Sequence, residues 1–130
     1  MAEPTEPINC IYPHVTVIAL TWRSYDNPRQ KEELNMVLGA FERLYGYQIR
    51  LFHIPSSARE RADTTARLKH EFHRVAGRDG RNLVVFYYQG RGALGRDGHL
   101  VLTDRQNRMY WSEICNAILA APCQVLSLLN

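Results

Sequence analysis

The 130-residue chain has only three cysteines and lacks a long apolar run. Cys10, Cys115 and Cys123 are odd in number and do not have the spacing of metal ligands, which argues against a disulfide framework and a metal site. A membrane-spanning helix needs roughly 20 consecutive apolar residues, and the acidic, proline-containing residues 1–9 are unlike a signal peptide. These absences predict a soluble cytoplasmic protein with no membrane partner, no metal and no cofactor.

Lysine is also scarce, because Lys31 and Lys69 are the only lysines among 16 basic residues. The net charge of +3 is too small to indicate a nucleic-acid partner. Arginine instead gathers in residues 74–108, where seven arginines accompany three aspartates. This segment is either a solvated face, the interpretation that we favour, or a docking surface for acidic peptide or phosphate, which guanidinium groups bind bidentately.

The length of the chain and its apolar content of 45% suffice for one packed domain. Residues 1–12 contain Pro4 and Pro7 and few core-forming side chains, so we expect a flexible N-terminal arm there. Residues 13–130 are expected to form a single α/β domain.

The clearest strand pattern is Leu-Val-Val-Phe-Tyr-Tyr at residues 83–88, which Gln-Gly-Arg-Gly follows directly. Six consecutive apolar or aromatic residues are typical of a strand buried on both faces in the middle of a parallel sheet. We expect the glycines at positions 90 and 92 to form a turn that presents Arg91 at the carboxyl end of this strand. In open α/β sheets, ligands usually bind at that edge.

Other segments have the composition of strands and helices in the same domain. Strands are expected at residues 14–20, 47–54 and 123–129, and a short hairpin is expected at residues 99–102 and 109–110. The alternation of these strands with helical segments predicts a three-layer α/β/α sandwich with a mainly parallel sheet and right-handed crossovers.

Three helices are predicted between the strands. The first covers residues 28–45 and is capped by Asn27. The second covers residues 57–76 and begins with a capping box at Ser57. The third covers residues 111–121 and is expected to turn these side chains inward: Trp111, Ile114, Cys115, Ile118 and Leu119.

Gly90, Gly92 and Gly95 match the pattern G-x-G-x-x-G, which makes a phosphate or nucleotide site an alternative. Such a site needs a helix directly after the glycines, whose N–H groups bind the phosphate. Residues 96–101 instead have the pattern of a turn that leads into a strand. The histidines also lack a site pattern, because His70 and His73 have no further ligand at metal spacing, and His53 ends a strand.

Tyr87-Tyr88-Gln89-Gly90-Arg91-Gly92 resembles the Tyr-Tyr-x-Gly-His-Gly signature of caspase-like cysteine proteases, especially the metacaspase and fungal caspase-domain branch. The resemblance covers nearly all of residues 14–130. Further matching segments lie in the same order: Trp22 near Asp26, residues 54–56, residues 111–114 and residues 125–130. The resemblance implies the larger part of a caspase fold, with four parallel strands in the spatial order second, first, third, fourth, and helices on both faces.

Two departures from the family predict that the chain is not an enzyme. Arg91 stands where the family has the histidine that exchanges a proton with the nucleophile, and a guanidinium stays protonated and has no acceptor lone pair. The nucleophilic cysteine would follow Asn130, itself at a position where the family usually has aspartate, and Asn130 is the last residue. Cys123 is expected roughly 20 Å away, at about 3.3 Å per residue along its strand. Of the oxyanion donors that the family uses, the backbone N–H of Gly92 is retained.

The two departures thus predict an inactive caspase-like domain that acts through protein–protein interaction in regulation. Cell-death or immune-type signalling in a fungus-like host is what the resemblance implies. Its partner is expected to be a second copy or another caspase-like chain, bound at the edge of the last strand through Val125, Ser127 and Leu129. The other candidate binding residues are Arg23, Arg91 and Arg96. Two alternatives stay open: the chain is an N-terminal piece of a cysteine endopeptidase, or Arg91 is a surface substitution without a ligand.

Overall fold

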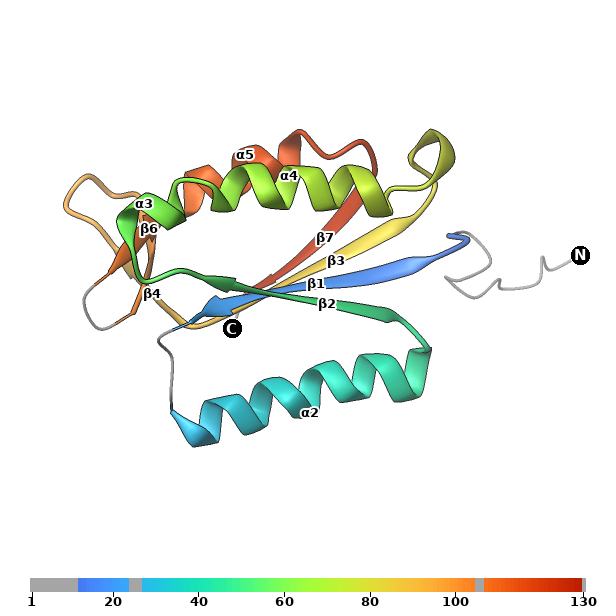
Figure 1. The fold of residues 1–130 in the computed structure, drawn as a ribbon, viewed down its shortest axis with the longest axis horizontal. Coiled ribbons are helices and arrows are strands. Elements are labelled where there is room, and N and C mark those ends of the chain that lie inside the picture. The colour runs from blue at the N-terminus through green and yellow to red at the C-terminus, as the bar shows by residue number, and fades with distance from the viewer. Residues whose placement is uncertain (1–11, 24–26, 105–106, 130) are drawn as a thin grey trace, which may run out of the picture.

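A parallel sheet of four strands forms the middle layer of the domain (Figure 1). The computed structural model describes residues 12–23, 27–104 and 107–129. The strands lie side by side in the order β2-β1-β3-β7, and each neighbouring pair is parallel. Their bounds are β1 (Val15–Trp22), β2 (Gln48–Ile54), β3 (Leu83–Gln89) and β7 (Gln124–Leu129). β7 is the segment expected as the fourth parallel strand, so the predicted α/β class with a mainly parallel sheet is confirmed.

Helices cover both faces of this sheet, which gives three layers (Figure 1). One face packs against α2 (Pro28–Tyr45), through a core that includes Val17, Leu34 and Leu38. The opposite face packs against α4 (Thr64–Val75) and α5 (Trp111–Leu119), through a larger core that includes Phe72 and Phe86. β1 lies between two strands and two helical layers, and for this reason all of its residues are buried.

The first helix has the predicted ends. The Asn27 side chain accepts a hydrogen bond from the backbone N–H of Arg29 at 3.0 Å, which caps the amino end of α2. Gly46 follows the last residue of α2 with φ of 68°, a left-handed conformation that favours glycine. α2 therefore has a fixed start beside the carboxyl ends of β1 and β2 (Figure 1).

The second predicted helix is two helices, α3 (Ala58–Arg61) and α4. The prediction of a capping box is wrong, because the Ser57 side chain makes no capping hydrogen bond. α3 has no buried residue, whereas α4 buries Leu68, Phe72 and Val75 against the sheet. Only the segment with an apolar stripe packs against the sheet, and the segment without one stays at the surface.

The glycine-rich turn expected after the central strand is a strand. β4 (Arg91–Leu94) pairs with β5 (Leu100–Thr103), and β5 pairs with β6 (Arg108–Tyr110), so an antiparallel sheet of three strands replaces the predicted two-stranded hairpin. Gly90 and Gly92 do not have a positive φ. Gly90 is required for space instead, because a Cβ there would lie 2.4 Å from the Tyr88 hydroxyl oxygen.

Two predictions of burial were wrong. Leu119, expected to face inward, is 82% exposed, and Ile114 and Ala117 are the buried residues of α5. The last strand, expected to be buried, exposes Leu126 (52%) and Leu129 (49%). Leu126 lies on the α2 side of the sheet, and α2 lies over β1 and β2 and leaves this outer strand uncovered, which explains the exposure of Leu126 (Figure 1).

Most of the predicted N-terminal arm lies outside the described residues, although Tyr12 packs against the core on the α2 side. Within the described part of the chain, no helix has the length and apolar character that crossing a bilayer requires. A short 3-10 turn, η1 (Arg78–Gly80), connects α4 with β3.

We predict that Gly90→Ala destabilises the fold by roughly 1–3 kcal/mol, because the new methyl group would displace the Tyr88 hydroxyl. Gly92→Ala is the matched control, since the nearest atom to its Cβ would lie 3.6 Å away. Urea denaturation of both variants measures the difference. Equal stability of the two variants would contradict the close approach at Gly90.

Candidate functional site

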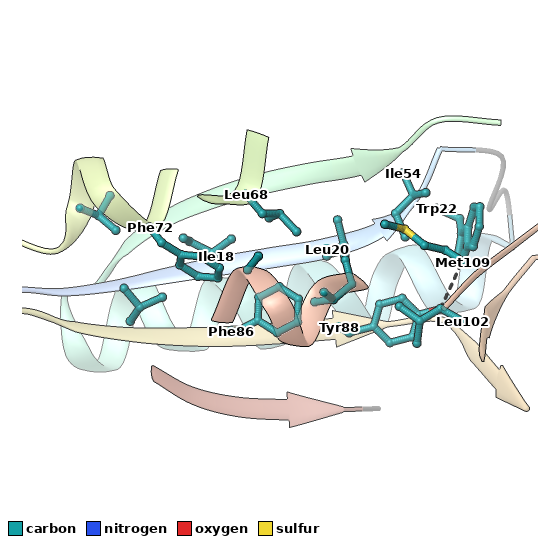
Figure 2. Packing of buried hydrophobic residues seen from close by; sticks show 14 residues of the cluster. Ile18, Leu20, Trp22, Ile54, Leu68, Phe72, Phe86, Tyr88, Leu102 and Met109 are labelled. Atoms are coloured by element: carbon teal, nitrogen blue, oxygen red, sulfur yellow. Dashed lines mark hydrogen bonds between the residues drawn. The ribbon is translucent and has the colours of Figure 1, made fainter. Parts of the chain in front are cut away.

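A chain of hydrogen bonds fixes the carboxyl edge of the central strands on the α4 and α5 side. The indole N–H of Trp22 donates to the Tyr88 hydroxyl at 3.0 Å, the bond drawn in Figure 2. The Tyr88 hydroxyl in turn donates to the backbone carbonyl of Arg91 at 2.9 Å. β1, β3 and the start of β4 are thereby connected through one phenol oxygen.

The Arg91 residue is exposed, and its backbone carbonyl accepts the hydrogen bond from the Tyr88 hydroxyl. A guanidinium group donates hydrogen bonds and does not accept a proton near neutral pH, so this side chain cannot serve as a general base. Gly92 is the next residue of β4 and pairs with Leu102, which places its backbone in a strand instead of an open turn.

The described cysteines lie away from this edge. Cys115 is in α5, and Cys123 precedes β7, whose first residue pairs with Leu83 at the start of β3. Burial raises the pKa of both thiols, which lowers the fraction of reactive thiolate at neutral pH. Of the residues that the structure describes, none places a thiol at the carboxyl ends of the parallel strands.

A cavity of about 290 Å³ opens on the α2 side of the same edge. Alternate residues of a strand point to the same face, so the ends of β1, β2 and β3 turn Arg23, His53 and Gln89 toward α2. The first turns of α2 close the other side. The lining residues are Thr21, Trp22, Arg23, Gln30, Lys31, Leu34, Asn35, Leu51, His53 and Gln89.

Gln89 connects the floor of the cavity to its wall. It is only 4% exposed, and its amide N–H donates to the backbone carbonyl of Gln30 in α2 at 2.8 Å. Its own backbone carbonyl accepts a hydrogen bond from the Thr21 hydroxyl at 2.9 Å. These bonds join β1, β3 and the start of α2, so the cavity has a fixed framework.

Positive charge surrounds His53 in this cavity. Partial burial lowers the pKa of His53 below its ordinary value, and the charges of Arg23 and Lys31 lower it further. Burial and both cations therefore favour the neutral imidazole. Arg23 also lies 3.7 Å from Glu60 in an ion pair whose two side chains are 61% exposed, so solvent screens that pair strongly.

The structure does not bring the three predicted binding arginines together. Arg23 lines the cavity, Arg91 begins β4, and Arg96 is exposed in the turn beyond the other end of β4. At about 3.4 Å per residue, β4 separates Arg91 from Arg96 by roughly 10 Å or more. A further member of the arginine-rich segment, Arg74, binds the buried carboxylate of Glu71 and is not available as a free docking group.

The predicted interface residues lie on one face of β7, toward α4 and α5. Val125, Ser127 and Leu129 pair with inward-facing residues of β3, and Val125 packs partly buried against the core on that side. Ser127 and Leu129 are exposed. Asn130 lies outside the described residues.

The sequence pattern did not predict Lys31, His53 and Gln89 as site residues. His53 is the second-last residue of β2, Gln89 is the last residue of β3, and Arg23 directly follows β1. This shared position at the carboxyl ends of parallel strands is a signal that could have grouped them. Lys31 lies near these residues only because α2 packs beside the strand ends. The glycine pattern at residues 90–95 does not form a phosphate loop, because a strand follows Gly90 where a helix would be needed. The described residues contain no group of three or more histidine, cysteine, aspartate or glutamate side chains that could hold a metal ion.

We predict that Cys115 and Cys123 react slowly with iodoacetamide at pH 7 in a Cys10→Ser variant, slower than free cysteine, because their raised pKa leaves little thiolate. Their reaction rate should rise at a higher pH than that of free cysteine. Unfolding in guanidinium chloride is the control and should restore the rate of a free thiol. Either thiol reacting faster than free cysteine in the folded protein would indicate an activated nucleophile and contradict this assignment.

No protein-family model matches this chain, and no curated protein matches it significantly. The likeness to caspase-like proteases therefore rests on the residues and their order along the chain. Two features of the structure bear on function, the exposed outer strand β7 and the polar groups at the carboxyl edge of the sheet.

Proposed function

We propose that this chain is a catalytically inactive caspase-like domain that acts by binding another protein chain along the outer edge of β7. The carrying observation is β7 itself, an apolar strand with one strand neighbour, β3, among the described residues. The order of the parallel strands and the position of Arg91 after the third of them support the caspase-like part of the proposal.

The absence of catalysis is supported by the groups at the carboxyl edge. Thiol proteolysis needs a thiolate and a base that exchanges its proton. Arg91 lacks the basicity for that role, and His53 belongs to the α2 side of the sheet, next to two cations that disfavour its protonation. The described thiols are half-buried on other elements, with raised pKa values.

The binding role is supported by what β7 leaves exposed. Leu126, Leu128 and Leu129 are 52%, 38% and 49% exposed, and the outer side of the strand presents backbone groups to a partner strand. A fully buried leucine contributes about 1.5–3 kcal/mol, so covering the exposed halves of three leucines would contribute roughly 2–4 kcal/mol. A ladder of backbone hydrogen bonds would add to this and set the register.

The partner that this edge fits is a second copy of the chain. Two β7 strands related by a two-fold axis would pair antiparallel, place leucines opposite leucines and close the assembly as a dimer. Such pairing would extend the sheet from four strands to eight across the two copies. Regulation of cell-death or immune-type signalling in the cytoplasm is the role that the caspase resemblance suggests for this assembly.

We expect the protein to be a dimer by size-exclusion chromatography with multi-angle light scattering, and the double variant Leu126→Lys/Leu128→Lys to be a monomer. Both side chains are exposed in the single chain, so the variant should keep its fold, while opposed lysines would repel across the strand pair.

Leu119→Lys is the matched control, because it adds a charge at an 82% exposed leucine on α5 and should leave the dimer intact. Circular dichroism confirms that each variant is folded. A wild-type protein that stays monomeric at high concentration would overturn the proposed pairing.

We also expect no hydrolysis of fluorogenic arginyl, lysyl or aspartyl peptides, because the carboxyl edge lacks a proton-accepting side chain at position 91. The same result is expected for a longer form of the chain that carries a cysteine beyond Asn130. An active, well-characterised cysteine protease assayed on the same peptides is the positive control. Turnover by the wild-type chain that thiol alkylation abolishes would refute the inactive assignment.

A further inference from the structure

The cavity beside α2 combines two cations that come from different elements. Arg23 follows β1, and Lys31 lies in the first two turns of α2. The sequence separates them by a loop, and the fold brings both to one opening with His53 of β2. Arg23, Lys31 and His53 line the same cavity, and both cations lower the pKa of His53.

Negative charge is missing from the described lining. All ten lining residues are neutral or basic, and the first turn of α2 has no acidic residue. Glu60 approaches Arg23 from α3, but this pair is largely exposed and its carboxylate is not part of the lining. Among the described lining residues no carboxylate offsets the charges of Arg23 and Lys31, so these charges favour an anion in the cavity.

The walls limit the kind of anion. Leu34 is buried and Leu51 is 42% exposed, and both are apolar residues of the lining beside the cations. A volume of about 290 Å³ lies at the lower end of the range of small-molecule sites. Inorganic phosphate would satisfy the charges and leave this apolar part of the lining in contact with water.

We propose that this cavity binds a small organic anion, in which a carboxylate or phosphate group contacts Arg23 and Lys31 and an apolar body covers Leu34 and Leu51. Gln30 and Asn35 supply additional amide groups at the rim. The buried amide of Gln89 is already bonded to Gln30, so it holds the wall in place and is not expected to contact the ligand.

This site is separate from the β7 edge. The cavity is lined by β1, β2, β3 and α2, and no residue of β7 contributes to it. Anion binding and strand pairing can therefore be tested separately, and the failure of one would leave the other standing.

The test uses phenyl phosphate and benzoate as probes, with inorganic phosphate and neutral benzyl alcohol for comparison. Binding is followed by two-dimensional NMR, with the His53 ring protons as the local signal. We expect at least one of the two aromatic anions to bind, more tightly than inorganic phosphate and benzyl alcohol. Which of the two binds more tightly distinguishes a phosphate ester from a carboxylate as the preferred class.

Arg23→Gln and Lys31→Gln should each weaken this binding about tenfold or more, as expected for the loss of one charge-assisted contact. Both side chains are exposed, so the variants should remain folded. The double variant Arg43→Gln/Lys69→Gln is the control, because it removes one arginine and one lysine from positions outside the lining. It should bind as tightly as the wild type.

A bound anion should also raise the pKa of His53, because it offsets the charges of Arg23 and Lys31 that lower it. An NMR titration of the ring with and without probe measures the shift. The proposal is overturned if no probe binds at millimolar concentration, if benzyl alcohol binds as tightly as the anions, or if the control variant loses as much affinity as the two site variants.

Discussion

The hydroxyl of Tyr88 is the contact on which the carboxyl edge of the sheet depends. It accepts a hydrogen bond from Trp22 of β1 and donates one to the carbonyl of Arg91, so a single oxygen holds the end of β1 against the beginning of β4. This geometry needs Gly90, since a Cβ would lie 2.4 Å from that oxygen. A buried phenol that lost both partners would carry a large desolvation cost, which makes the arrangement strongly preferred over alternatives.

At this carboxyl edge, the two faces of the sheet differ: the face toward α4 and α5 is packed, and the face toward α2 has a cavity. Toward α4 and α5, Trp22 and Tyr88 are buried in a packed apolar core with Leu102 and Met109, as Figure 2 shows. Toward α2, the next residues along the same strands, among them Arg23 and Gln89, surround a cavity. The alternation of side chains along a strand thus separates structural residues from polar ones within one short stretch of sequence.

The α/β class, the parallel strands and the ends of α2 could be predicted because each depends on local pattern: buried runs, an asparagine cap and a terminal glycine. The strand β4 could not, because Arg91–Leu94 is not an apolar strand pattern and becomes a strand only by pairing with β5. Exposure of Leu119 and of β7 also depends on which surface the helices leave uncovered. To predict the cavity, one would need both the ends of the strands and the position of Lys31 on α2. The sequence pattern indicates the strand ends but does not indicate where Lys31 lies.

The proposed loss of catalysis is compatible with an intact scaffold for a physical reason. At position 91 the hydrogen bond from Tyr88 goes to the backbone carbonyl, and the side chain points to solvent. Any residue can supply that carbonyl, whereas position 90 requires glycine. The folding constraint therefore falls on position 90 and leaves the side chain at position 91 free to vary, so an arginine there leaves the hydrogen-bond chain unchanged. In a domain built in this way, the side chain at position 91 can change while the sheet edge and the surfaces proposed for binding stay intact.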